Sequence, residues 1–134
     1  MCLCCVIENQ RVYESNYFYF LLDYEPRVNG HLLVIPKRHV SKAHELSKEE
    51  WGDLSTLIPK AVSVFSKFLL TDQYIILEKN GPNANQVVPH VHFHLLPVTT
   101  QKWADIFEKV PRQLNKTELA EEVKLFRSYF LSES

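Results

Sequence analysis

Residues 90–96 have the sequence His-Val-His-Phe-His-Leu-Leu, in which histidine alternates with an apolar residue. This alternation predicts a β-strand ended by Pro97, because successive side chains of a strand point to opposite faces. The three histidines should share one face, about 6–7 Å apart in steps of two residues. Val91, Phe93 and Leu95 should point into the core. Three histidines in five residues are hard to explain by solubility alone, so this strand is interpreted as the functional centre.

Two kinds of chemistry fit such a strand. Two histidines at positions i and i+2 can both ligate zinc. Alternatively, a neutral imidazole can attack phosphorus at pH 7, while neighbouring imidazoles hold its tautomer and protonate the leaving group. The preceding loop, residues 80–86, is rich in small and amide residues that can turn backbone N–H groups and the Gln86 amide toward an anionic oxygen. The loop therefore favours phosphorus chemistry over a bare metal site.

The rest of the chain predicts further strands. Residues 11–14 and 17–22 are rich in aromatic and β-branched side chains and are expected to form a hairpin. Residues 31–35, stopped by Pro36, and residues 74–78 have the same character.

Two helices are expected. Ser47 with Glu50 three residues later has the pattern of a capping box, and a second helix should begin at Asn115. Pro59 should kink the first helix or divide it. The helices are segregated and too few for a doubly wound fold, so we expect an α+β fold with helices packed on an antiparallel sheet.

Composition excludes several classes of protein. The 134 residues carry 15 Lys and Arg against 16 Asp and Glu, a formal charge of −1, which argues against nucleic-acid binding and against a polybasic membrane-surface module. No apolar run approaches the roughly 20 residues that a membrane-spanning helix needs. The three cysteines all lie within residues 2–5, which does not suit a disulfide framework, and no signal peptide is recognised. We therefore expect one cytoplasmic domain over residues 1–134.

The triad strand and the segments around it resemble the histidine triad (HIT) family of nucleotide hydrolases and transferases. The resemblance extends over residues 2–98 and includes the loop and strand of residues 80–96, the segment 30–39, residues 12–14 and Asp23. The family implies a five-stranded antiparallel sheet that joins its copy across a homodimer into ten strands. Residues 2–98 would then be the motif-bearing core, and residues 99–134 a C-terminal helical extension.

The resemblance also implies roles for the triad. His92 would be the nucleophile that attacks the α-phosphate and becomes transiently nucleotidylated, and the His90 carbonyl would accept its Nδ1–H. His94 would contact the phosphate or the leaving group, and Gln86 and Asn80 would bind phosphate oxygens.

The implied substrates are adenosine or other nucleoside phosphates joined to an amine, a fluoride-like leaving group or another nucleotide, with no metal needed for the chemical step. Asp23 would accept hydrogen bonds from both ribose hydroxyls, which suits a bidentate carboxylate. The nucleobase slot would be lined by Leu3, Ile7, Leu21 and Tyr24, each equally plausible as core.

Two positions depart from the family pattern. Val87 stands where Ser or Thr is usual, which removes one hydroxyl contact to the phosphate or leaving group. Asn85 stands where Gly is common, and Asn tolerates a positive φ.

Several bacterial members of the family carry a structural zinc, and by this resemblance the matching positions here would make Cys2, Cys5, His39 and His90 the ligands. Two thiolates and two imidazoles make a closed tetrahedral site. The alternative is a reduced N-terminus without metal, with His39 capping a turn. His44 is the substitute ligand should His39 not serve.

Three functional hypotheses follow. The leading one is a nucleotidyl hydrolase or transferase acting through a covalent adduct on His92. The second is a non-catalytic purine-nucleotide-binding dimer, and the third is metal-dependent hydrolysis by the triad itself.

Overall fold

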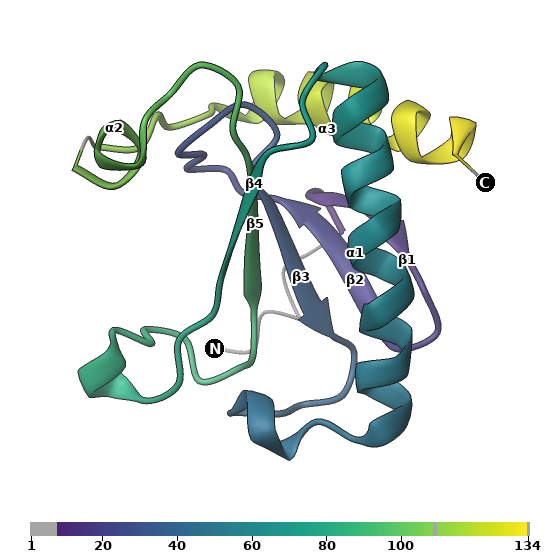
Figure 1. Ribbon diagram of the computed structural model, residues 1–134, viewed down its shortest axis with the longest axis vertical. Helices are drawn as coiled ribbons and strands as arrows, with labels where there is room; N and C mark the ends of the chain where they lie inside the picture. The colour runs from purple at the N-terminus through teal and green to yellow at the C-terminus, as the bar shows by residue number, and fades with distance from the viewer. Residues whose placement is uncertain (1–7, 109, 134) are drawn as a thin grey trace.

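The computed structural model describes residues 8–108 and 110–133 (Figure 1). The predicted zinc ligands Cys2 and Cys5, and the predicted nucleobase-slot residues Leu3 and Ile7, lie outside the described residues.

The centre of the molecule is a five-stranded sheet in which every neighbouring pair is antiparallel, as predicted. Its spatial order is β1-β2-β3-β5-β4, so β1 and β4 are the edge strands. The strands are β1 (Arg11–Glu14), β2 (Phe18–Leu22), β3 (Leu32–Pro36), β4 (Tyr74–Leu77) and β5 (Phe93–Pro97).

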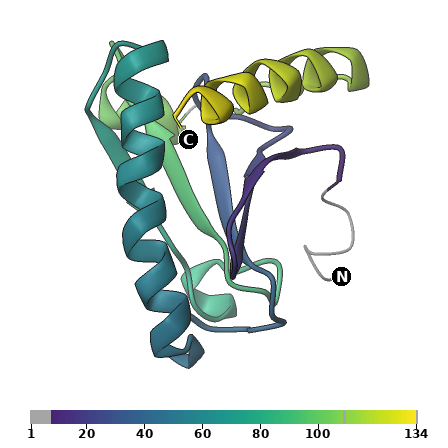
Figure 2. The ribbon, with the colours of Figure 1, turned by 90° about the vertical axis from the view of Figure 1, so that its right-hand side faces the viewer.

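Two long helices, α1 (Lys48–Phe68) and α3 (Lys116–Ser132), contribute to the same main core with the sheet (Figures 1 and 2). Period-2 alternation sends Phe20, Val34 and Leu95 of the sheet into this core. Each such side chain, fully buried, stabilises the fold by about 1.5–3 kcal/mol.

Helix α1 begins as the sequence predicts and continues past its proline. The Ser47 hydroxyl accepts the N–H of Glu50, and the Glu50 carboxylate accepts the N–H of Ser47. The helix is not divided at Pro59. Leu57 and Ala61, on either side of the proline, are both buried, and packing of this face outweighs the one backbone hydrogen bond that proline removes.

Helix α3 also starts at its predicted cap, Asn115, and its apolar stripe is buried. Phe130 stacks on Tyr13 with ring centroids 5.4 Å apart and meets Phe20 edge-on at 5.3 Å. Residues of the C-terminal segment therefore complete the core above β1 and β2.

Three short elements were not predicted: the 3₁₀ turns η2 (Ala43–Glu45) and η3 (Pro82–Ala84), and the six-residue helix α2 (Trp103–Glu108). Within the described ranges, no helix combines the length and apolarity that crossing a bilayer requires.

Candidate active site

The site lies on the sheet face opposite α1, where β5 runs between β3 and β4. In the register of the sheet, His94 pairs with Leu33 of β3 and with Leu77 of β4, so all three side chains share this face. A cavity of about 410 Å³ opens there. Its lining includes Asp23, Tyr24, Arg27, His31, Lys79, Val87, His92, His94 and Phe107.

The prediction of one strand over residues 90–96 is wrong at its start, because β5 begins at Phe93. Pro89 lacks an N–H, and the N–H of Val91 donates to the Val40 carbonyl of a loop, at 2.7 Å, rather than to the sheet. His90 is fully buried, and it is His92 and His94 that line the cavity. The three imidazoles therefore do not form one row on the sheet face.

His92 has the geometry of a nucleophile. Its Nδ1 lies 2.9 Å from the carbonyl oxygen of His90, the contact that the resemblance implies. Because a carbonyl only accepts, Nδ1 carries the proton and Nε2 keeps its lone pair. The His92 and His94 rings meet edge-on, with centroids 5.1 Å apart.

His94 is held by a fourth histidine, His31. The N–H of Arg27 donates to His31 Nδ1 at 3.1 Å, so in the neutral ring Nε2 of His31 carries the proton. That Nε2 lies 2.9 Å from Nδ1 of His94. His94 thus accepts at Nδ1 and carries its own proton on Nε2.

Both rings are neutral at pH 7. Burial, together with smaller contributions from the neighbouring His94 and Arg27, lowers the pKa of His31 to about 3. Burial also lowers the pKa of His94 to about 4, with added repulsion from His92, Lys79 and Arg27. His94 can therefore donate a hydrogen bond from Nε2 to a phosphoryl oxygen, and it cannot readily give up a proton altogether.

Asp23 lies where β2 ends, at the edge of the same cavity. One carboxylate oxygen accepts the N–H of Glu25 at 2.9 Å, and the other lies 3.6 Å from Nε2 of His31. Burial raises the pKa of Asp23, although the hydrogen bond from the Glu25 N–H acts to lower it. Asp23, His31 and His94 could together hold a metal ion, since their ligand atoms lie within 4.8 Å of one another. The shortest distance among these ligand atoms is that between His31 and His94, and the hydrogen bond between the two rings explains it without a metal ion.

The two predicted phosphate-binding amides both brace the loop before β5. Gln86 accepts the N–H of Gly81 at 2.7 Å and donates to the Ser41 carbonyl at 2.8 Å. Asn80 accepts the N–H of Ala43 at 2.8 Å, and its amide donates to the Glu78 carboxylate. Contact with a phosphate would require these bonds to exchange, so that role stays a prediction.

The loop itself has the positive φ angles that its sequence suggests. Asn85 adopts φ 68° and Gly81 φ 95°. Asn85 thus takes the left-handed conformation that a glycine would adopt at lower cost.

The two described residues of the predicted nucleobase slot differ in exposure. Tyr24 is half exposed and lines the cavity. Leu21 is buried on the same sheet face as His94, in a small cluster with Leu33 and Ile35.

His39 and His90 come together as the zinc prediction requires. Their Nδ1 atoms lie 3.3 Å apart, and Nε2 of His90 lies 2.9 Å from the Pro36 carbonyl. That carbonyl accepts the Nε2 proton and leaves the Nδ1 lone pair of His90 directed at His39. His44 lies on the exposed turn η2, and no contact with this pair is found among the described residues.

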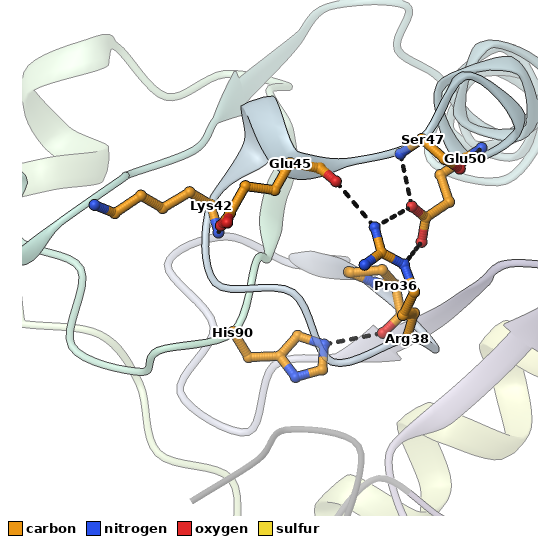
Figure 3. Close-up of polar contacts among 7 residues, drawn as sticks. All are labelled: Pro36, Arg38, Lys42, Glu45, Ser47, Glu50 and His90. Carbon is orange, nitrogen blue, oxygen red and sulfur yellow. Dashed lines mark hydrogen bonds and ion pairs between the residues drawn. The ribbon is translucent and has the colours of Figure 1, made fainter.

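An ion pair between the exposed Arg38 and the buried Glu50 holds the segment that carries His39 (Figure 3). Arg38 donates to the Glu50 carboxylate at 2.8 Å and to the Glu45 carbonyl at 2.9 Å. Burial opposes ionisation of Glu50, yet hydrogen bonds from Arg38 and Ser47 leave its pKa below the usual value. The same carboxylate caps α1, so one group fixes both the helix start and this loop.

Among the cavity-lining residues that sequence reasoning missed are Arg27, His31, Lys79 and Phe107. For His31 a signal was available, because the alternation of the strand 31–35 puts it on one face with Leu33 and Ile35. The pairing of β3 with β5, which brings it to His94, has no local signature.

The fold and this arrangement of imidazoles define a class of protein that carries a histidine triad on an antiparallel sheet. The HIT domain family model matches residues 5–101, and the chain belongs to the HIT family.

Curated relatives of two kinds are similar to it. The adenosine 5′-monophosphoramidase hnt1 of Schizosaccharomyces pombe is 42% identical over 82 residues, which cover 61% of this chain and 59% of that protein. The asymmetrical bis(5′-nucleosyl)-tetraphosphatase of the same species is 33% identical over 84% of this chain and 61% of its own length. The chain thus spans about three-fifths of either relative.

A solved structure is similar over more of its length. The Zn-bound histidine triad family protein of Mycobacterium smegmatis aligns with a TM-score of 0.70 at 25% identity, covering 91% of this chain and 84% of that one.

Proposed function

We propose that this chain is a nucleotidyl hydrolase or transferase. It would cleave at the α-phosphate of nucleoside phosphoramidates or dinucleoside polyphosphates through a covalent intermediate on His92. The observation that carries the proposal is the 2.9 Å contact of His92 Nδ1 with the His90 carbonyl, which leaves Nε2 free beside the cavity. The phosphoramidase and tetraphosphatase among its relatives support the reaction class.

The reaction has two steps. Nε2 of His92 forms a bond to the α-phosphorus while the bond to the leaving group breaks, and the electron pair departs with that group. Water then attacks the phosphorus, loses a proton to solvent, and releases the nucleoside monophosphate and free His92. His94 donates its Nε2–H to the phosphoryl oxygen on which charge develops in both steps.

The remaining predicted contacts complete the substrate site. Asp23 accepts the ribose hydroxyls, Gln86 and Asn80 bind phosphate oxygens, and Leu21 and Tyr24 line the base. The position of Asp23 and Tyr24 at the cavity supports the first and last of these roles.

We also propose that the chain forms a homodimer through strand β4. This strand is an edge of the sheet, and Tyr74 and Ile76 expose 40% and 44% of their surface on it. Pairing with a second β4 would give partners to the backbone N–H and C=O groups of the open edge and cover both side chains. It would also join the two sheets into one sheet of ten strands. Sedimentation equilibrium tests this, and a monomer at every concentration would refute it.

A structural zinc held by Cys2, Cys5, His39 and His90 is the third part of the proposal. Two nitrogens bound to one tetrahedral zinc at about 2.0–2.1 Å lie roughly 3.3 Å apart, and the Nδ1 atoms of His39 and His90 are 3.3 Å apart. The ion would fasten the Cys2–Cys5 segment to the site without entering the reaction. Metal analysis of the purified protein tests this, and a ratio far below one zinc per chain would refute it.

The unit proposed is one domain over residues 1–134, with motif-bearing core 2–98 and C-terminal extension 99–134. Its proposed location is the cytoplasm, supported by the cluster of thiols that a reducing compartment would preserve.

The experiment that tests the function is the substitution His92→Asn. We expect loss of hydrolysis by about 10³-fold or more, because the substitution removes the proposed nucleophile, while nucleotide binding persists. Acid quenching of the native protein during turnover should trap a nucleotidyl adduct that the variant lacks.

Two outcomes would redirect the proposal. Nucleotide binding without turnover or adduct in the native protein would favour the non-catalytic binding module. Activity that disappears with a chelator while the fold remains would favour metal-dependent hydrolysis.

A further inference from the structure

The leaving group is the part of the substrate that the proposed function leaves open. We propose that the cavity selects an anionic leaving group, so that dinucleoside polyphosphates are its substrates in preference to phosphoramidates of cationic amines. This inference rests on the proposed function and assigns the selection to Lys79, assisted by Arg27.

Lys79 is a cation at the cavity, and among the described residues no counter-ion is found for it. It lines the same cavity as His92 and His94, and its charge is close enough to His94 to contribute to the lowered pKa of that ring. No hydrogen bond or ion pair is found for its ammonium group within residues 8–108 and 110–133. An ammonium that is partly buried and unpaired beside a phosphoryl site gains most from an anion placed there.

Strand order separates Lys79 from the proposed ribose site. Asp23 follows β2 and Lys79 follows β4, while His94 lies on β5 between them, in the order β2-β3-β5-β4. The register of the paired strands places one row of neighbouring residues across the sheet: Leu21, Leu33, His94 and Leu77. A nucleotide with its ribose at Asp23 and its α-phosphate at His92 therefore extends its leaving group toward Lys79.

Arg27 adds a second positive charge, held in place from the other side. It donates to the Ile106 carbonyl at 3.3 Å, and its guanidinium lies 5.7 Å from the centroid of the Phe107 ring. Its charge contributes to the lowered pKa values of His31 and His94. Helix α2 thus fixes a cation at the wall of the cavity.

Two carboxylates also line the cavity, and neither neutralises Lys79. Asp23 accepts from Glu25 and faces His31, and Glu25 accepts from the Gln113 amide at 3.2 Å. Both lie on the β2 side of His94, so neither of the carboxylates that line the cavity lies on the β4 side with Lys79.

The protonation state of the histidines at the site also favours an anionic leaving group. When the bond from the α-phosphorus to the bridging oxygen breaks, the electron pair stays on the departing phosphate, which is stable as an anion next to an ammonium. When a bond to nitrogen breaks, the amine must gain a proton. The histidine nearest to His92, His94, holds only the proton of its neutral form, which makes it a poor acid at pH 7.

The test compares two substrates and four proteins. The substrates are diadenosine triphosphate and AMP joined to the side-chain amine of lysine. The proteins are the native chain, Lys79→Gln, Lys79→Arg and Lys48→Gln. Lys48 is an exposed lysine at the start of α1, outside the cavity, and its substitution removes the same charge.

We expect Lys79→Gln to lower kcat/KM for diadenosine triphosphate by about tenfold and to leave the phosphoramidate within about twofold. Lys79→Arg should keep most of the polyphosphate activity, because the charge is retained, and Lys48→Gln should change neither value. Raising the salt concentration should reduce the polyphosphate rate of the native protein and affect Lys79→Gln less.

An equal fall with both substrates, or no fall with diadenosine triphosphate, would overturn the inference and leave the proposed function standing. Absence of turnover with either substrate in the native protein would overturn the function instead. In that case, binding of a methylene-bridged diadenosine triphosphate still tests the inference, since binding that Lys79→Gln does not weaken would refute the role of Lys79.

Discussion

Every buried imidazole around the site has a partner that determines which nitrogen carries its proton. Carbonyl oxygens accept from Nδ1 of His92 and from Nε2 of His90, and a backbone N–H donates to Nδ1 of His31. None of these three assignments depends on a titrating neighbour. Backbone geometry therefore sets the tautomers, and His94 receives its tautomer from His31.

His31 should act as a positioning residue through His94. We expect His31→Leu to lower kcat by about 10²-fold with KM within about threefold, because a His94 freed to take the other tautomer no longer presents Nε2–H to the phosphate. Steady-state kinetics measure the two parameters separately.

The conservative variant distinguishes positioning from mere packing. His31→Gln can still donate an N–H to His94, so it should recover at least about tenfold of the lost kcat. Equal losses in the Leu and Gln variants would show that His31 is needed only for its bulk.

At the scale of elements, short-range sequence signals predicted where the helices begin and which face of α3 is buried. Contacts between segments far apart in the chain determined the start of β5 and the continuity of α1. The caps Ser47 and Asn115 and the buried stripe of α3 follow from short-range spacing, and the structure confirms them. The strand start at Phe93 instead of His90 and the unbroken α1 at Pro59 depend on contacts made by distant segments.

The site divides in the same way. The His92–His90 contact joins residues two apart and was implied by the resemblance. The His31–His94 hydrogen bond joins residues 63 apart, and Arg27 is held by α2, so neither was visible in the sequence.

Helix α3 is anchored in the main core by Phe130. Phe130 is 1% exposed between Tyr13 and Phe20, and Leu125 on the same helix is 45% exposed. Phe130→Ala should lower the free energy of unfolding by about 3–5 kcal/mol, because it leaves a cavity in the main core. Leu125→Ala should cost about 0.5 kcal/mol or less. Urea denaturation of both variants measures the difference.

Similar small losses in the two variants would show that α3 is not anchored in the core. They would also undermine the conclusion that the C-terminal segment stabilises β1 and β2.

For the whole molecule, the neutral histidines make stability depend on pH. The pKa values of His31 and His94 are lowered to about 3 and about 4, against about 6.5 in an unfolded chain. Below pH 6.5 the unfolded chain therefore binds protons that the folded protein excludes, and the free energy of unfolding falls as pH falls toward 4. Asp23 acts in the opposite sense, because its pKa is raised by burial and protonation favours the folded form.

The two histidine shifts should dominate above pH 5, where an ordinary carboxylate has not yet begun to protonate. We expect a loss of about 3–4 kcal/mol between pH 7 and pH 5, roughly 2 kcal/mol for each of the two histidines, measured by urea denaturation at intervals of half a pH unit. His31→Leu should give a shallower slope over the same window, because one excluded proton site is gone. A flat profile in the native protein would mean that the rings are protonated in the folded state, which would remove the basis for a neutral His94 as hydrogen-bond donor.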